Sequence, residues 1–91
     1  MSKKNLTPNR KGKHHVIMLN DNHNTFDHVV DCIMDICGYT YLQAVQCAVL
    51  VHEMGRCQIM EDDYETCSYV QKQLLREGLN VIVEKYVKKN K

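Results

Sequence analysis

Residues 19–26 (LNDNHNTF) carry the residue types best suited to chemistry in this chain. The segment lies between an apolar run that is typical of a strand and an apolar stripe that is typical of a helix. It contains no Lys or Arg, and its amide and carboxylate oxygens, with a ring nitrogen of His52 further along, are hydrogen-bond acceptors. Acceptors beside apolar walls favour a ligand that joins a small cation to a hydrophobic group. Asn and Asp are also ordinary turn formers, so the segment alone is weak evidence for a site.

A strand and a helix must hold this turn in place. Residues 16–19 (VIML) predict a strand buried on both faces, because four apolar residues in succession end at the polar turn. Asn24 is expected to be the N-cap of the following helix, and Gly38 lies just past its end. The apolar positions of this helix recur at helical spacing: Phe26, Val29, Val30, Ile33, Ile36 and Cys37.

The rest of the chain predicts two more helices and two more strands. Thr40-x-x-Gln43 is a capping-box pattern that opens a second helix, which Gly55 ends. Residues 57–60 alternate as in a short strand, and the acidic run at 61–63 with Glu65 predicts the start of a third helix, which stops at Gly78. Residues 79–84 contain three β-branched residues in succession, at 81–83, and predict the last strand. We therefore expect a small single-domain α+β fold, β-α-α-β-α-β, whose three-stranded sheet has three helices packed on one side.

The charges are distributed unevenly along the chain. Residues 1–14 carry five basic groups and no acid, and we expect them to form a flexible arm; residues 88–91 are a basic tail. Between Asp21 and Glu84, eleven carboxylates face three basic side chains, a formal charge of −8. The predicted domain, residues 15–87, is thus acidic, which attracts cationic ligands and repels phosphate backbones. Nucleic-acid binding is therefore disfavoured.

The five cysteines, at positions 32, 37, 47, 57 and 67, include no Cys-x-x-Cys pair, and the residues before them do not resemble a secretory signal. This favours a cytoplasmic protein whose reduced thiols pack as small apolar side chains. No apolar run approaches the length of a membrane span, so we expect no membrane partner.

Three other functions are alternatives to the ligand site. His14, His15, His23 and His28 offer metal ligands, but the usual ligand spacings are missing, so we expect no bound metal and no cofactor. A cysteine hydrolase would need a thiol beside a histidine. The cysteine and the histidine of the second predicted helix are five residues apart, which puts them on different faces of that helix. A ribosome- or RNA-associated interaction domain that uses the basic ends is the alternative from a different class, and steep salt dependence of RNA binding would support it.

Four elements of the sequence together resemble the ClpS adaptors of bacterial AAA+ proteases. They are residues 16–22 (VIMLNDN), the helix from Phe26 to Gly38, Ala44-x-Gln46 and Val51-His52-x-x-Gly55. The resemblance extends from about residue 15 to about residue 85. It implies a monomeric adaptor, not an enzyme, that captures proteins by a destabilising N-terminal residue, an N-degron. The adaptor would hand them to an unfoldase, ClpA or ClpC, for degradation with ClpP.

The resemblance also implies a site for the substrate's α-amino group. An ammonium group has three donors, and charge assistance makes its hydrogen bonds strong. The residues implied to hold it are Asn20, Asp21, Asn22, Asn24 and His52.

The first side chain of the substrate would enter an apolar pocket beside the amine site. Burying a large apolar side chain gains about 1.5 to 3 kcal/mol, which favours Phe, Leu, Tyr or Trp. Without the resemblance, ordinary core packing would explain these positions. The residues implied to form the pocket are Met18, Phe26, Val29, Ala48 and Val51.

The sequence departs from the family pattern Asn-Asp-Asp-x-Thr-Pro-Met. Asn22 replaces the second acid, and Asn24-Thr25-Phe26 replaces Thr-Pro-Met. Ala48 stands where the resemblance leads us to expect a methionine, which predicts a reshaped pocket that tolerates β-branched N-terminal residues. For docking to the N-domain of the unfoldase, Asp62 and Glu65 match the family best.

Overall fold

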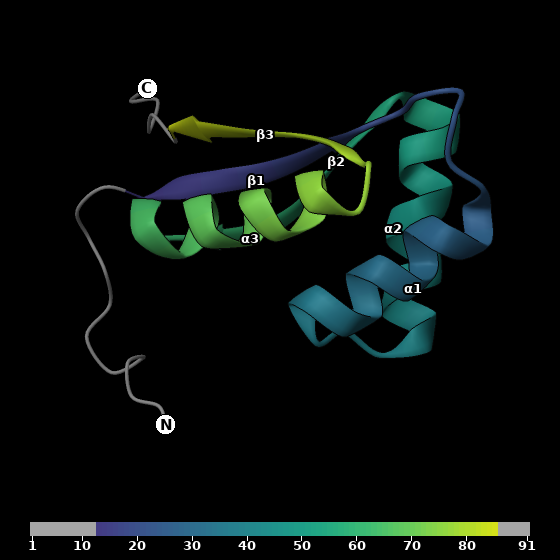
Figure 1. Cartoon of the computed structure of the whole chain (residues 1–91), viewed down its shortest axis with the longest axis horizontal. Helices are drawn as coiled ribbons and strands as arrows, with labels where there is room; N and C mark the ends of the chain where they lie inside the picture. The colour runs from purple at the N-terminus through teal and green to yellow at the C-terminus, as the bar shows by residue number, and fades with distance from the viewer. Residues whose placement is uncertain (1–12, 86–91) are drawn as a thin grey trace, which may run out of the picture.

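The computed structural model describes residues 13–85. Most of the predicted arm, residues 1–12, and the predicted tail, residues 88–91, lie outside this range. The chain forms strands and helices in the predicted order (Figure 1). They are β1 (His14–Leu19), α1 (Phe26–Cys37), α2 (Tyr41–Met54), β2 (Arg56–Asp62), α3 (Tyr64–Arg76) and β3 (Asn80–Lys85).

The three strands form one antiparallel sheet in the order β2-β1-β3. The central strand therefore has a neighbour on each edge, and three successive side chains in it are buried: Val16, Ile17 and Met18 are 0%, 3% and 1% exposed. Successive side chains of a strand point to opposite faces, so both faces of β1 are covered here. The prediction of a strand buried on both faces is confirmed.

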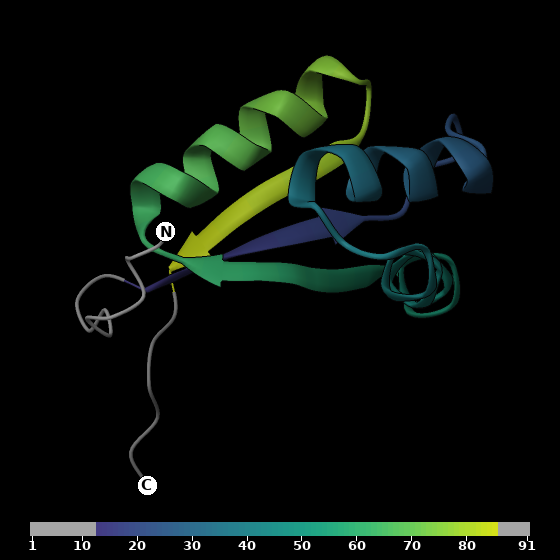
Figure 2. The same cartoon turned by 90° about the horizontal axis from the view of Figure 1, so that it is seen from below.

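The helices pack on the sheet and on one another in a way that leaves β1 pointing at the α1–α2 pair. Helix α3 covers β1 and β3, α1 lies on the same side of the sheet, and α2 packs against α1 and β2 near the end of the strands (Figure 2). The Tyr39 hydroxyl, between α1 and α2, donates a hydrogen bond to the carbonyl of Ile59 in β2. The largest fully buried side chains are Met18, Ile33, Ile59, Leu74, Val16 and Cys67.

Most of the predicted helix ends are confirmed, but the predicted N-cap of α1 is wrong. Thr25 is the cap, with its Oγ1 accepting from the backbone N–H of His28 at 3.1 Å. Asn24 cannot serve because its side chain is engaged with two other segments, as described below. Gly38 and Gly55 adopt the left-handed conformation just past α1 and α2, with φ of 74° and 91°.

The acidic run at 61–63 divides between a strand and a helix, which corrects the prediction that all of it begins α3. Glu61 and Asp62 belong to β2, and Asp63 caps α3 by accepting from the N–H of Thr66 at 2.8 Å. The carboxylate of Glu61 lies 3.3 Å from Lys13 Nζ and 3.5 Å from His15 Nε2. These cross-strand partners favour the longer strand.

None of the described helices is long and apolar enough to cross a membrane.

Candidate functional site

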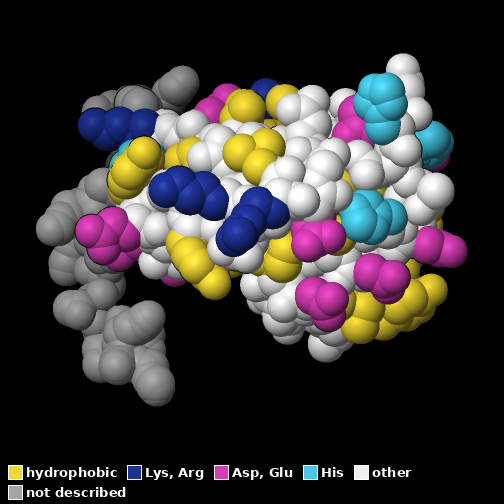
Figure 3. Space-filling model, viewed as in Figure 1, with side chains coloured by type: hydrophobic (Ala, Val, Ile, Leu, Met, Phe, Trp, Pro, Cys, Tyr) yellow, Lys and Arg dark blue, Asp and Glu magenta, His cyan; other side chains and the backbone are white. Residues whose placement is uncertain are grey.

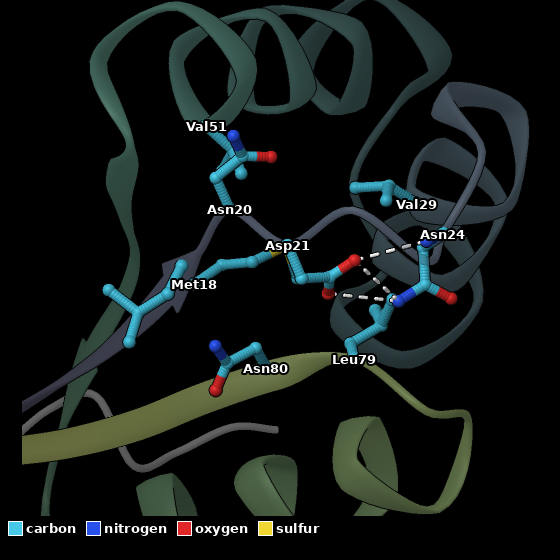
Figure 4. A pocket seen from close by; sticks show the side chains of 9 residues that line it. Met18, Asn20, Asp21, Asn24, Val29, Val51, Leu79 and Asn80 are labelled. Carbon is cyan, nitrogen blue, oxygen red and sulfur yellow. Dashed lines mark hydrogen bonds between the residues drawn. The ribbon is translucent and has the colours of Figure 1, made fainter.

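The polar turn between β1 and α1 is held by the carboxylate of Asp21. Its Oδ1 accepts from the backbone N–H groups of His23 and Asn24 at 2.9 and 3.0 Å. The side-chain amide of Asn24 donates to both carboxylate oxygens (Figure 4). It also donates, at 2.9 Å, to the carbonyl of Gly78 in the α3–β3 turn. The turn that carries the site is thus fixed to a segment 54 residues away in the sequence.

These contacts change the acidity of Asp21. Partial burial alone would raise the pKa, but hydrogen bonds from the backbone of His23 and Asn24, the Asn24 side chain and the nearby His23 charge outweigh it. The pKa of Asp21 consequently lies below its ordinary value of 3.8. The carboxylate stays ionised and keeps a negative charge beside the site.

Three other polar side chains of the predicted site are free to accept. The backbone N–H of Asn20 donates to the carbonyl of Gly55 at 3.0 Å, which fixes β1 to the end of α2. In the part of the chain that the structure describes, the side chains of Asn20, Asn22 and His52 are exposed and make no hydrogen bond. The Asn20 amide points toward Val51 of α2 and away from the Asp21 carboxylate (Figure 4). Acceptors without partners in the fold are available to a ligand.

One open pocket collects these side chains, with a volume of about 340 Å³. Its floor contains Ala48 and Val51, which are 3% and 5% exposed, and Phe26 is 43% exposed. Four of the five predicted apolar residues and all five predicted polar ones line it: Asn20, Asp21, Asn22, Asn24, Phe26, Val29, Ala48, Val51 and His52.

Met18 is the predicted pocket residue that does not line this pocket. It is 1% exposed and instead lines an adjoining cavity of about 20 Å³, room for about one water, together with Leu79 and Asn80 (Figure 4). Sequence reasoning missed these two residues and Gly78. No local signal marks them, since the pairing of β3 with β1 and the hydrogen bond from Asn24 to Gly78 bring this distant segment to the site.

The pocket is suited to binding an amine that carries a hydrophobic group. Its polar residues are acceptors, and no Lys, Arg, Cys or Ser lines it. Burial raises the pKa of Cys32 and Cys37 to about 11 and that of Cys57 to about 12, so these three thiols, which lie outside the pocket, are not activated nucleophiles. We find acceptors and apolar walls in one place but no activated nucleophile among the pocket residues.

The two predicted docking residues lie far from the pocket. Asp62 ends β2, where its carboxylate accepts from the N–H of Asp63 at 2.7 Å, and Glu65 is exposed in the first turn of α3. Figure 1 shows that this end of α3 is at the opposite end of the molecule from α2. A partner bound there would leave the pocket accessible.

Three comparisons with known proteins agree with one another. A family model described as "ATP-dependent Clp protease adaptor protein ClpS" matches residues 9–82. The ATP-dependent Clp protease adapter protein ClpS of Synechocystis sp. is 39% identical over 67 residues, which cover 72% of this chain and 68% of that protein. The structure of Agrobacterium tumefaciens ClpS2 bound to L-phenylalaninamide has the same fold, with a TM-score of 0.79 at 16% identity, covering 85% of this chain and 100% of that one.

The fold and the pocket define a small α+β binding domain. The chain belongs to the ClpS family, the adaptor proteins of ATP-dependent Clp proteases.

The lowered pKa of Asp21 leads to a prediction about stability. Because the folded state favours the ionised carboxylate, its contribution is complete above the pKa of the unfolded chain and is lost as the pH falls through the lowered folded pKa. Urea denaturation at a series of pH values should show that Asp21→Asn costs most near neutral pH and progressively less below about pH 4. A cost of Asp21→Asn that does not change with pH would contradict the assignment.

Proposed function

We propose that this protein binds proteins that begin with a bulky hydrophobic residue and delivers them to a ClpA- or ClpC-type unfoldase for degradation by ClpP. The observation that carries the proposal is the single pocket in which free acceptors border an apolar floor. In this function the protein is an adaptor without catalysis of its own. We expect it to act as a monomer in the cytoplasm, in keeping with its five free thiols.

The polar rim supports recognition of an unblocked N-terminus. Asn20 and His52 come from different elements, β1–α1 and α2, and both line the same pocket with unpaired acceptors. A protonated terminus offers three donors in one group, which internal peptide bonds do not. The ionised Asp21 adds a negative charge nearby, although its oxygens already accept from the turn. We therefore assign direct contact with the amine to Asn20 and His52, supported by Asn22.

The floor supports recognition of a hydrophobic first side chain. Val29 and Val51 from neighbouring helices face the same space as Ala48, and Phe26 offers a partly exposed ring. L-phenylalaninamide, the compound bound to the similar ClpS2, joins a free amine to a benzyl group. A ligand of that chemistry would match both parts of the pocket described here.

Delivery requires a second surface, which we place at the start of α3. Glu65 is exposed there and Asp62 lies beside it at the end of β2. Carboxylates on a rim favour a basic surface on the partner. Because this surface is at the far end of the molecule from the pocket, substrate and unfoldase could be held together (Figure 1).

Loss of either amine acceptor should weaken capture. Asn20→Ala and His52→Ala should each lower the affinity for a peptide beginning with Phe by roughly 5- to 150-fold, since a buried donor left unpaired costs about 1 to 3 kcal/mol. Fluorescence anisotropy measures this, with His23→Ala, an exposed change in the same turn outside the pocket, as the control. Equal binding of the acetylated peptide would falsify recognition of the amine.

The small side chain of Ala48 should set which residues are accepted. Ala48→Met fills part of the floor. The first side chain of a peptide that begins with Ile or Val branches at Cβ and is therefore widest where it meets the rim. These peptides should lose more affinity than those beginning with Leu. We expect the Ile-to-Leu affinity ratio to fall at least roughly fivefold, from an overpacking cost of about 1 kcal/mol or more. Val49→Met, which is outside the pocket on the same helix, should leave the ratio unchanged.

Charge reversal at the start of α3 should separate delivery from capture. Glu65→Lys should weaken binding to a purified ClpA or ClpC N-domain by roughly two- to fivefold, as expected for a rim charge, while binding of the Phe peptide stays unchanged. Asp35→Lys, exposed on α1, is the matched control. Loss of both activities in Glu65→Lys would argue against a separate docking surface.

A further inference from the structure

A cluster of three metal-binding side chains lies outside the pocket, between α1 and the α3–β3 turn. His28 and Cys32 are one helical turn apart on α1, and Glu77 follows α3. One ligand atom from each lies within 4.8 Å of the other two. The Cys32 sulfur is 3.6 Å from His28 Nε2 and 3.9 Å from Nδ1. Donor atoms around a tetrahedral zinc ion are about 3.4 to 3.6 Å apart, so the side chains of His28, Cys32 and the exposed Glu77 must rotate to bring their ligand atoms around one ion.

The hydrogen bonding of His28 fixes which ring nitrogen can bind a metal. Its Nε2 lies 2.9 Å from the backbone carbonyl of Glu77. A carbonyl can only accept, so Nε2 carries the proton, and in the neutral ring Nδ1 has the free lone pair. Histidines that bind metals usually donate their other N–H to a carbonyl or carboxylate in this way, which fixes the tautomer. The lone pair is therefore on the ring nitrogen that is 3.9 Å from the sulfur.

The local charge favours a cation at this position. Burial is the largest cause of the raised pKa of Cys32, and the carboxylates of Glu77, Asp35 and Asp31 raise it further. A dication lowers this negative potential and stabilises the thiolate it binds. Figure 3 shows acidic side chains gathered near histidines at the end of the molecule formed by α1 and α2, with Lys and Arg toward the other end.

We propose that His28, Cys32 and Glu77 bind one zinc ion that joins α1 to the α3–β3 turn. Sulfur, imidazole and carboxylate are all ligands of zinc, and three protein ligands leave a fourth position for water. The usual ligand spacings did not predict this set from the sequence, because His28-x-x-x-Cys32 mixes ligand types and Glu77 is distant in sequence. The site is independent of the proposed capture of N-termini.

Metal binding to the full, reduced chain without peptide tests the proposal. Co²⁺ should produce the charge-transfer absorption of a thiolate complex, and zinc should remove it by displacement. In competition with a chromogenic chelator, Cys32→Ser, His28→Ala and Glu77→Gln should each bind zinc at least roughly 10-fold more weakly. Even loss of a residue that only hydrogen-bonds to a metal ligand lowers metal affinity by about that factor. Zinc should also raise the melting temperature of the wild type but not of Glu77→Gln.

Matched variants make the outcome decisive. Cys47→Ser and His23→Ala change the same residue types outside the cluster and should bind zinc as the wild type does. Because Cys32 is 5% exposed, Cys32→Ser requires a check of folding by circular dichroism, whereas Glu77→Gln changes an exposed side chain. Equal zinc affinity in wild type and Glu77→Gln, or a cobalt band that depends on Cys47 in place of Cys32, would overturn the proposal. Peptide capture, measured in chelator, is unaffected by that result.

Discussion

The amide of Asn24 is the contact on which the geometry of the pocket depends. It joins the Asp21 carboxylate in the β1–α1 turn to the Gly78 carbonyl in the α3–β3 turn. Because β1 and β3 also pair along their length, the polar turn is fixed both through the sheet and through this side chain. The start of α1 is thereby fixed, and with it the positions of Phe26 and Val29 in the pocket.

The polar residues of the site form two groups, according to whether their side chains make hydrogen bonds within the protein. Asp21 and Asn24 use their side chains within the protein, in the manner of ordinary turn formers. Asn20, Asn22 and His52 have no such partner among the described residues and face the pocket. The structural interpretation of the segment thus holds for Asp21 and Asn24, and the functional interpretation is proposed for Asn20, Asn22 and His52. A folded domain that leaves several acceptors unused beside an apolar floor is arranged for a ligand with donors.

The parts of the fold that the sequence predicted are those set by local interactions. The capping box of Thr40 and Gln43 is present, Gly38 ends α1 as expected, and the apolar run before the turn is the central strand. The errors arose where a distant partner competes with a local preference. Asn24 is a residue type that often caps helices, but its amide is bound to Gly78. Glu61 extends β2 because it pairs with His15 of β1. The site residues came from a family resemblance, since periodicity alone does not separate a pocket wall from a core.

The exposure of the pocket residues fits a ligand that is the end of a chain. A fully closed cavity would suit a free small molecule, whereas a protein terminus must leave its following residues outside. The graded burial here, from Val51 at 5% to Phe26 at 43%, provides a covered floor below an open rim. Only the first residue can then be desolvated, so most of the hydrophobic gain comes from that one side chain. In the proposed function, the acceptors on the rim decide whether that residue is a true terminus, because the same side chain within a chain brings no ammonium group to satisfy them.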